Sequence, residues 1–378
     1  MATVELIHPR RDAPLLVLIV VMSVVAAGYP SYLVHPVTLL APVPLLVALL
    51  LLDDARFTSP IWIGLVGAMA VWTVLLYLAM TGRVNGLVYS LSMYLPFAAL
   101  AFRIRRPEPV ALTFAVITST LVSIRAVASF VHSGADLVPW EVYEGNQLAA
   151  ELTVLLPLVI VAGLALPAEW RKTRLLLAAV VVGGLVSIVV NLGRAGLGAL
   201  VILLLLGLAR TSWRTLLVVG AAGLAAGAVM SSSIVSLLER IRFVHFVPSN
   251  ASRPEIWSVA TDALRRTAWL GVGPGNSGEA LRQVGGGHAH NNLVQTALET
   301  GWPGALLMAG LTVYLIVLAA RLLWRGGDGT LWALSLIGYV LYSIVSSPIQ
   351  RPDFTLALVL VVLVAREHPG TRGEQWTQ

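Results

Sequence analysis

Runs of apolar residues, separated by short polar segments, recur along most of the chain. A helix needs about 20 apolar residues to cross the hydrocarbon core of a bilayer, and twelve segments approach that length. The pattern therefore predicts an all-α polytopic membrane protein with one transmembrane helix for each segment. The segments are residues 13–30, 37–52, 59–81, 84–102, 109–131, 147–166, 174–191, 195–209, 214–231, 302–323, 329–347 and 352–365.

One long stretch, residues 232–301, interrupts this pattern and divides the chain into three parts. Residues 1–231 are expected to form a nine-helix transmembrane region, and residues 232–301 a large extracytoplasmic loop. Residues 302–378 are expected to hold three transmembrane helices and a cytoplasmic tail. We expect the three parts to form one integrated domain.

The large loop is predicted to contain amphipathic helices. In "SRPEIWSVATDALRRTAWLG", Ser252 and Glu255 have the spacing of a capping box, so a helix should begin here. Its apolar residues recur at helical spacing and should face either lipid or the bundle. The turn-rich "GVGPGNSG" follows. Residues 290–300 predict a second helix, which ends at Gly301, directly before the tenth span.

The basic residues orient the helices, because cytoplasmic loops of membrane proteins are enriched in Arg and Lys. With a cytoplasmic N-terminus, the short outer loops hold Arg83, Arg194 and Arg351, whereas fifteen basic residues fall on the inner side. This bias predicts that both termini are cytoplasmic and that residues 232–301 face the exterior. The inner residues are Arg10, Arg11, Arg56, Arg103, Arg105, Arg106, Arg171, Lys172, Arg174, Arg210, Arg214, Arg321, Arg325, Arg366 and Arg372.

Composition agrees with a membrane location. The chain of 378 residues is 57% hydrophobic and 12% charged, with a mean hydropathy of +0.84, which excludes an ordinary soluble domain. It has no cysteine, which excludes disulfides and thiolate metal sites. We expect membrane lipids among its partners and no nucleic acid.

A histidine and two arginines on the outer side carry the candidate chemistry. His290 lies at a helix N-terminus, where the positive end of the helix dipole disfavours an imidazolium, so this side chain should be a neutral base. Arg253 begins the first helix of the large loop, and Arg194 lies on the same side of the membrane. Guanidinium groups bind phosphate oxygens bidentately. These residues predict a site for a phosphate-bearing substrate, such as a lipid diphosphate.

Four further residues are candidate substrate contacts: His288, Asn291, Arg265 and Arg351. For Arg351, contact with a helix end or with lipid headgroups is an equal alternative. The pair His288 and His290 also raises a zinc interpretation, but no third ligand follows at a matching spacing. We therefore expect neither a metal nor another cofactor.

The segments "NLGRAGLGALVILLL", "SRPEIWSVATDAL", "GVGPGN" and "HAHNNLVQTALETGWPG" together resemble the bacterial O-antigen ligase and polymerase superfamily. The resemblance spans roughly residues 185–310. It implies an all-helical membrane glycosyltransferase of the inner membrane that moves a glycan from an undecaprenyl-diphosphate carrier to an acceptor hydroxyl, without a metal. It also implies that His290 is the catalytic base and that Arg194 and Arg253 bind the diphosphate, in an inverting displacement.

Other functions stay open beside a ligase. A polymerase shares the chemistry and differs in its acceptor, which is another repeat unit rather than a lipid core or a protein. A flippase or transporter for lipid-linked sugars is a rival of another class, although transporters usually contain internal repeats and midplane charges. A glycosyltransferase with an acidic first outer loop is disfavoured, because "GYPSYLVHP" holds no carboxylate. Arg125 and Glu151, within spans, either pair with each other or line the site.

Overall fold

A computed structural model describes residues 13–28, 56–57, 59–80, 94–103, 107–133, 139–190, 253–284, 288–327, 329–345 and 352–367 of the chain, with a few single positions between them. This part is mostly helical, as the apolar runs predict. Its elements are α1 (Ala13–Gly28), β1 (Arg56–Phe57), α4 (Pro60–Ala79), α6 (Leu95–Ala99), β2 (Phe102–Arg103), α7 (Pro107–Ser133), α8 (Pro139–Ala165), α9 (Arg171–Val190), α13 (Arg253–Arg266), α14 (Ser277–Ala280), the 3₁₀ turn η1 (Arg282–Val284), α15 (Asn292–Arg325), α16 (Gly329–Val345) and α17 (Pro352–Glu367).

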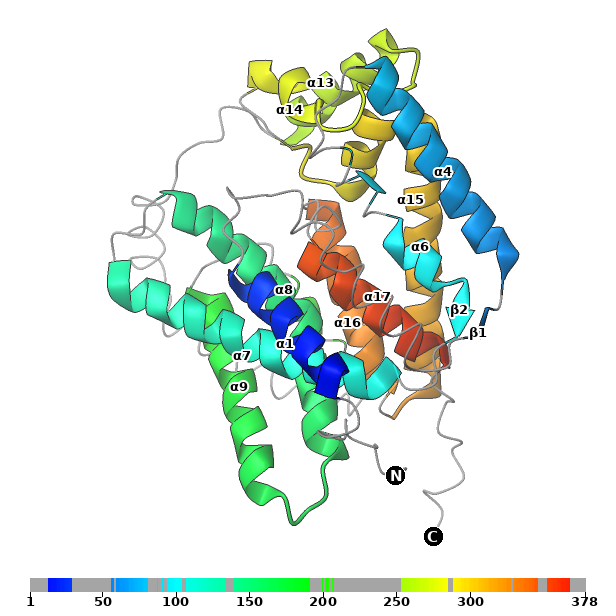
Figure 1. Ribbon diagram of the computed structural model, residues 1–378. Helices are drawn as coiled ribbons and strands as arrows, with labels where there is room; N and C mark the ends of the chain where they lie inside the picture. Colours follow the sequence, from blue (N-terminus) through cyan, green and yellow to red (C-terminus); the bar gives the residue numbers. More distant parts are fainter. Residues whose placement is uncertain are drawn as a thin grey trace.

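The long helices pack around α17 and α16. Helix α7 packs against α1, α8, α9 and α17, and α16 lies between α8 and α15. Every residue from 357 to 365 in α17 is buried, which agrees with a run that is apolar on all sides. Trp332 of α16 and Phe97 and Phe114 of the neighbouring helices are among the largest fully buried side chains of this core. The core therefore lies where the C-terminal helices insert between the N-terminal ones (Figure 1).

Three described helices are long and apolar enough to cross a membrane: α4, the first part of α7, and α15. Shorter apolar helices run through residues 151–165, 329–344 and 357–366. Helix α4 shows the surface that lipid requires, since Ile61 is 77% exposed and Leu78 66% exposed although both are apolar. The expected number of twelve spans is not confirmed. Residues 37–52 and 214–231, and most of 195–209, lie outside the described residues.

One expected span differs from the structure. Residues 84–102 should form a continuous helix, but the described end of this segment is the short α6, a turn, and β2. Pro96 stands in the first turn of α6, where proline starts a helix and does not continue one. Beyond the turn, β2 pairs antiparallel with β1, so that Arg56 lies opposite Arg103. This two-residue pair is a small departure from the all-α expectation.

The β1 and β2 pair and the helices α13 and α14 lie at opposite ends of the described structure (Figure 1). The β1 and β2 pair lies near the end of α17, whose Arg366 donates a hydrogen bond from Nη1 to the carbonyl of Leu100 at 2.7 Å. Helices α13 and α14 lie at the opposite end, beside the beginning of α15. Segments that were predicted to be cytoplasmic are thus separated by the bundle from the segment that was predicted to be exterior.

Candidate functional site

Helix α13 begins at Arg253, as the capping-box spacing predicts, and its apolar face packs inward. This face is buried in a small cluster with residues of η1, of α15 and of the segment 288–291, here called the histidine segment. The buried residues of α13 are Ile256, Ala260, Ala263 and Leu264. The sequence left open whether this face contacts lipid or the helix bundle; in the structure it packs against other residues of the protein. The indole of Trp257 donates a hydrogen bond from Nε1 to the carbonyl of Ala289 at 2.8 Å, which joins α13 to the histidine segment.

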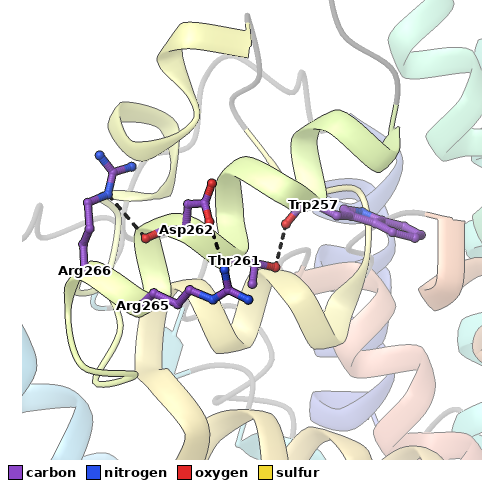
Figure 2. Close-up of polar contacts among 5 residues, drawn as sticks. All are labelled: Trp257, Thr261, Asp262, Arg265 and Arg266. Atoms are coloured by element: carbon purple, nitrogen blue, oxygen red, sulfur yellow. Dashed lines mark hydrogen bonds and ion pairs between the residues drawn. The ribbon is translucent and has the colours of Figure 1, made fainter.

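The other face of α13 is exposed and carries local polar contacts (Figure 2). Arg265 Nη1 lies 3.6 Å from Asp262 Oδ1, with both side chains mostly exposed, and Arg266 donates from Nε to the carbonyl of Asp262. Arg265 comes twelve positions after Arg253, which is about 18 Å along a helix axis. The two arginines therefore stand at opposite ends of α13, and Arg265 is paired within its own helix.

The glycine-rich segment after α13 forms a tight loop against the beginning of α15. Gly271, Gly273 and Gly275 all have positive φ, between +80° and +91°, a conformation that glycine adopts without steric cost. The N–H of Val272 donates to the carbonyl of Leu298 at 2.7 Å. A Cβ on Gly271 would lie 2.6 Å from the amide nitrogen of Gly301. The glycines thus allow two backbone segments to touch.

The same loop also reaches α4. Asn276 donates from Nδ2 to the carbonyl of Met80 at 3.2 Å, and a Cβ on Gly273 would lie 2.7 Å from the Cβ of Met80. From α4 itself, the Trp72 indole donates from Nε1 to the carbonyl of Thr300 at 2.8 Å. A helix that is long and apolar enough to cross a membrane therefore supports the loop segment from one side.

Helix α15 begins at Asn292 and has a kink at Gly301, where φ is +74° and ψ is −166°. Asn291 is the N-cap, with its side-chain oxygen accepting from the amides of Leu293 and Val294. Its Nδ2 donates to the carbonyl of Ile344 in α16 at 3.0 Å. The kink agrees with the sequence prediction of a helix that ends at Gly301, and the helix that follows is long and apolar enough to cross a membrane.

His290 directly precedes this cap. Its side chain is partly buried, and its backbone has a φ of +51°, which is uncommon for a residue with a side chain. Burial and the nearby positive charge of Arg253 both lower the pKa of His290 below its ordinary value of 6.5. Both effects favour the neutral imidazole at pH 7, and Arg253 is near enough for its charge to act on His290.

The remaining candidate residues divide into two groups. His288 is exposed, two residues before His290 in the same segment. Arg194 and Arg351 lie outside the described residues, as does the side chain of Arg125, while Glu151 of α8 is buried. Among the residues that the structure describes, no group of three His, Asp or Glu side chains is placed to hold a metal ion.

Sequence reasoning missed a buried polar cluster beside the histidine segment. Gln295 and Glu299 lie on the polar side of the helix that starts α15, yet both are buried, whereas Leu293 on the apolar side is 42% exposed. Glu299 accepts hydrogen bonds from Ser277, Gln295 and Ser90. The helical spacing of these polar residues was visible, but their partners on α14 and near α6 are distant in sequence.

Comparison with known proteins adds one finding. Residues 179–309, about a third of the chain, match the family model described as O-antigen ligase. The matched range contains α13, the glycine loop, His290 and the kink of α15. No curated protein matches the chain significantly. The match confirms the resemblance to the O-antigen ligase superfamily.

Proposed function

We propose, for a chain that carries the O-antigen ligase domain at residues 179–309, that it is a glycosyltransferase of the bacterial inner membrane. It transfers a glycan from an undecaprenyl-diphosphate carrier to an acceptor hydroxyl at the outer leaflet. The observation that carries this proposal is the place of His290, partly buried directly before the N-cap of α15, where burial and the charge of Arg253 lower the pKa of the imidazole. A neutral base near a permanent positive charge suits a reaction that takes a proton from one partner and leaves an anion on the other.

The reaction is an inverting displacement without a metal. The acceptor oxygen forms a bond to the anomeric carbon, and His290 takes the proton of the acceptor hydroxyl. The bond between the anomeric carbon and the carrier diphosphate breaks, and its electron pair stays on the diphosphate. Arg253 binds this leaving group, together with Arg194, which is included from the resemblance. A positioned general base contributes about 10²- to 10⁴-fold to such a rate.

The other candidate contacts receive different weights. Asn291 uses its oxygen in the cap and one amide hydrogen on Ile344, so its role is to hold the start of α15. Arg265 pairs with Asp262 far along α13, and it is the weaker candidate. His288 is exposed at the same segment as His290 and stays a candidate contact for donor or acceptor. Arg351 keeps its predicted role, because it is outside the described residues.

A transfer assay with purified protein in lipid nanodiscs tests the proposal. The donor is a polyprenyl-diphosphate glycan, and the acceptor is a lipid core, a protein or a second repeat unit in separate reactions. The expected result is a new glycosidic bond with release of polyprenyl diphosphate, and an unchanged rate in the presence of EDTA. His290→Ala should lower the rate by about 10²- to 10⁴-fold. Arg253→Lys should also lower it, because bidentate binding is lost.

The matched control is Thr261→Val, in α13, whose hydroxyl donates only to the carbonyl of Trp257 in the described contacts (Figure 2). This variant should keep the wild-type rate. Equal transfer by His290→Ala and wild type would remove the base assignment. Movement of the donor between leaflets without a new glycosidic bond would favour the transporter alternative, and transfer to a repeat unit alone would favour the polymerase.

Orientation in the membrane is tested separately, since the chain has no natural cysteine. Glu279→Cys and Trp324→Cys place single thiols at exposed positions at the two ends of the described structure. We expect a membrane-impermeant maleimide to label position 279 in spheroplasts and position 324 only after permeabilisation. The reverse pattern would place His290 on the cytoplasmic side and contradict the proposed donor.

A further inference from the structure

Ala289, between the two histidines, is fully buried. Its backbone N–H and its carbonyl both form hydrogen bonds with side chains. Its N–H donates to Gln295 Oε1 at 2.7 Å. Its carbonyl accepts from Trp257 Nε1 at 2.8 Å. The backbone that leads into His290 is therefore fixed by two helices, α15 and α13.

Glu299 determines how Gln295 is oriented. Gln295 donates from Nε2 to Glu299 Oε1 at 2.8 Å, and the same oxygen accepts from Ser277 at 2.8 Å. The second carboxyl oxygen accepts from Ser90 at 3.2 Å. A backbone N–H can only donate, and the carboxyl group here accepts, so the amide of Gln295 has one orientation that satisfies both neighbours. Its oxygen is directed to Ala289.

His290 needs such support because its φ of +51° is unfavourable for a residue with a Cβ. A backbone in a sparsely populated region persists when the surrounding structure determines it, and such positions cluster at functional sites. The two hydrogen bonds of Ala289 fix the backbone one residue before His290. Burial of the whole set, with Gln295 at 1% and Glu299 at 3% exposure, keeps water from replacing these bonds.

We infer that Gln295 and Glu299 are positioning residues for the glycan transfer reaction, which hold the His290 imidazole beside Arg253 through the peptide of Ala289. The inference rests on the proposed role of His290 as the base. Gln295 and Glu299 touch neither substrate nor the reacting atoms. Their loss should therefore lower kcat by displacing the base and leave donor binding nearly unchanged.

Three variants, at Gln295 and Glu299, test this positioning role. Gln295→Met keeps the length of the side chain but removes both hydrogen bonds, and it should lower kcat by about 10- to 100-fold, since small displacements of a catalytic group have effects of this order. The donor KM should change by less than about threefold, because Arg253 is untouched. Glu299→Leu should have the same effect. Glu299→Gln can still accept from Gln295 and Ser277 and can donate to Ser90, so it should retain wild-type kcat within about threefold.

The matched control is Thr296→Val, next to Gln295 in the same helix. Thr296 is as deeply buried, and its hydroxyl donates to the carbonyl of Asn292 at 2.7 Å. This variant should keep wild-type kcat. A general loss of folding would affect it and Gln295→Met alike, so equal losses in both would overturn the positioning role.

The acid limb of the profile of kcat/KM against pH gives a second measurement. In Gln295→Met the midpoint of this limb should rise toward pH 6.5. The displaced imidazole would be less buried and farther from Arg253, and these are the two causes that lower its pKa. A change in the amount of folded enzyme would lower the whole profile without moving the limb. If Gln295→Met does not accumulate, Trp257→Phe removes the other bond to Ala289 and should move the limb in the same direction.

Wild-type kcat with an unmoved limb in Gln295→Met, or in Trp257→Phe where the former does not accumulate, would overturn the inference. The proposed function has its own test. If His290→Ala retains transfer, the base assignment fails and the inference fails with it. If His290→Ala is inactive while Gln295→Met and Glu299→Leu have wild-type kcat, the positioning role alone is wrong.

Discussion

Gly301 is the position where a single methyl group should do most damage. Its φ of +74° and ψ of −166° lie in a region that is essentially restricted to glycine. A side chain in such a region costs about 1–3 kcal/mol. The Cβ of Gly301→Ala would also lie 2.5 Å from the carbonyl oxygen of Leu270 and 2.6 Å from that of Trp269. Both are backbone atoms, so the glycine-rich loop has to move away from α15.

That movement breaks the hydrogen bonds between the two segments. Val272 N–H to Leu298 O measures 2.7 Å, and Trp302 N–H to Trp269 O measures 3.0 Å. Each bond has a net value of about 0.5–1.5 kcal/mol. With the backbone strain, Gly301→Ala should lower the free energy of unfolding by about 2–6 kcal/mol. This is a large part of the 5–15 kcal/mol that is typical of a folded domain.

The measurement is the apparent unfolding midpoint of purified protein in one detergent, followed by the fluorescence of its 11 tryptophans. The control is Gly310→Ala, in the same helix, where an added Cβ meets nothing within 4 Å. Alanine is favoured over glycine inside a helix by about 0.5–1 kcal/mol, so this variant should unfold at the wild-type midpoint or slightly above. A Gly301→Ala midpoint equal to that of Gly310→Ala would refute the argument that the kink requires glycine.

Three further predictions concern the same region. If neutral His290 is the base, kcat/KM should fall as pH drops through its lowered pKa, with an acid midpoint below 6.5; Arg253→Gln removes the positive charge and should raise this midpoint, and a lower midpoint would contradict the sign. Asn291→Ala removes the N-cap of α15 and should destabilise the protein by about 0.5–2 kcal/mol in thermal unfolding, whereas Asn291→Ser, which can still cap, should recover most of the loss. Trp72→Phe removes the hydrogen bond to the carbonyl of Thr300 and should cost about 0.5–1.5 kcal/mol in the same assay; an unchanged midpoint would mean that α4 does not support the loop.

Sequence patterns predicted the elements of this region well, because their signals are local. The apolar run after Trp302 predicted the membrane-length part of α15, and the glycines predicted bends at Gly271, Gly273 and Gly301. The capping-box spacing predicted the start of α13 at Arg253. Each of these follows from a few neighbouring residues and the backbone conformations that they allow.

The partners of those bends could not be predicted, because they come from distant parts of the chain. Asn276 and Met80 are 196 positions apart, and Ser90 and Glu299 are 209 apart. Helical periodicity divides residues 292–300 into a polar and an apolar side, but it does not say which side meets protein. Burial of Gln295 therefore required the tertiary structure. The local pairing of Arg265 with Asp262 was within reach, since they are three residues apart in a helix.

The kink at Gly301 divides α15 into two parts with different surroundings. Beyond it, the apolar side chains of Leu306 and Val313 are 64% and 60% exposed, in the part of α15 that is long and apolar enough to cross a membrane. Before it, one side of α15, with Gln295, Leu298 and Glu299, is buried, and this part packs against α13 and the glycine-rich loop. The bend is held by backbone hydrogen bonds from Val272 to Leu298 and from Trp302 to Trp269, so the segment that contains His290 has a defined place relative to the apolar part of α15. In the proposed reaction, with α15 across the bilayer, this arrangement would hold the base at the depth of the lipid-carrier diphosphate, because the bilayer sets the depth of both.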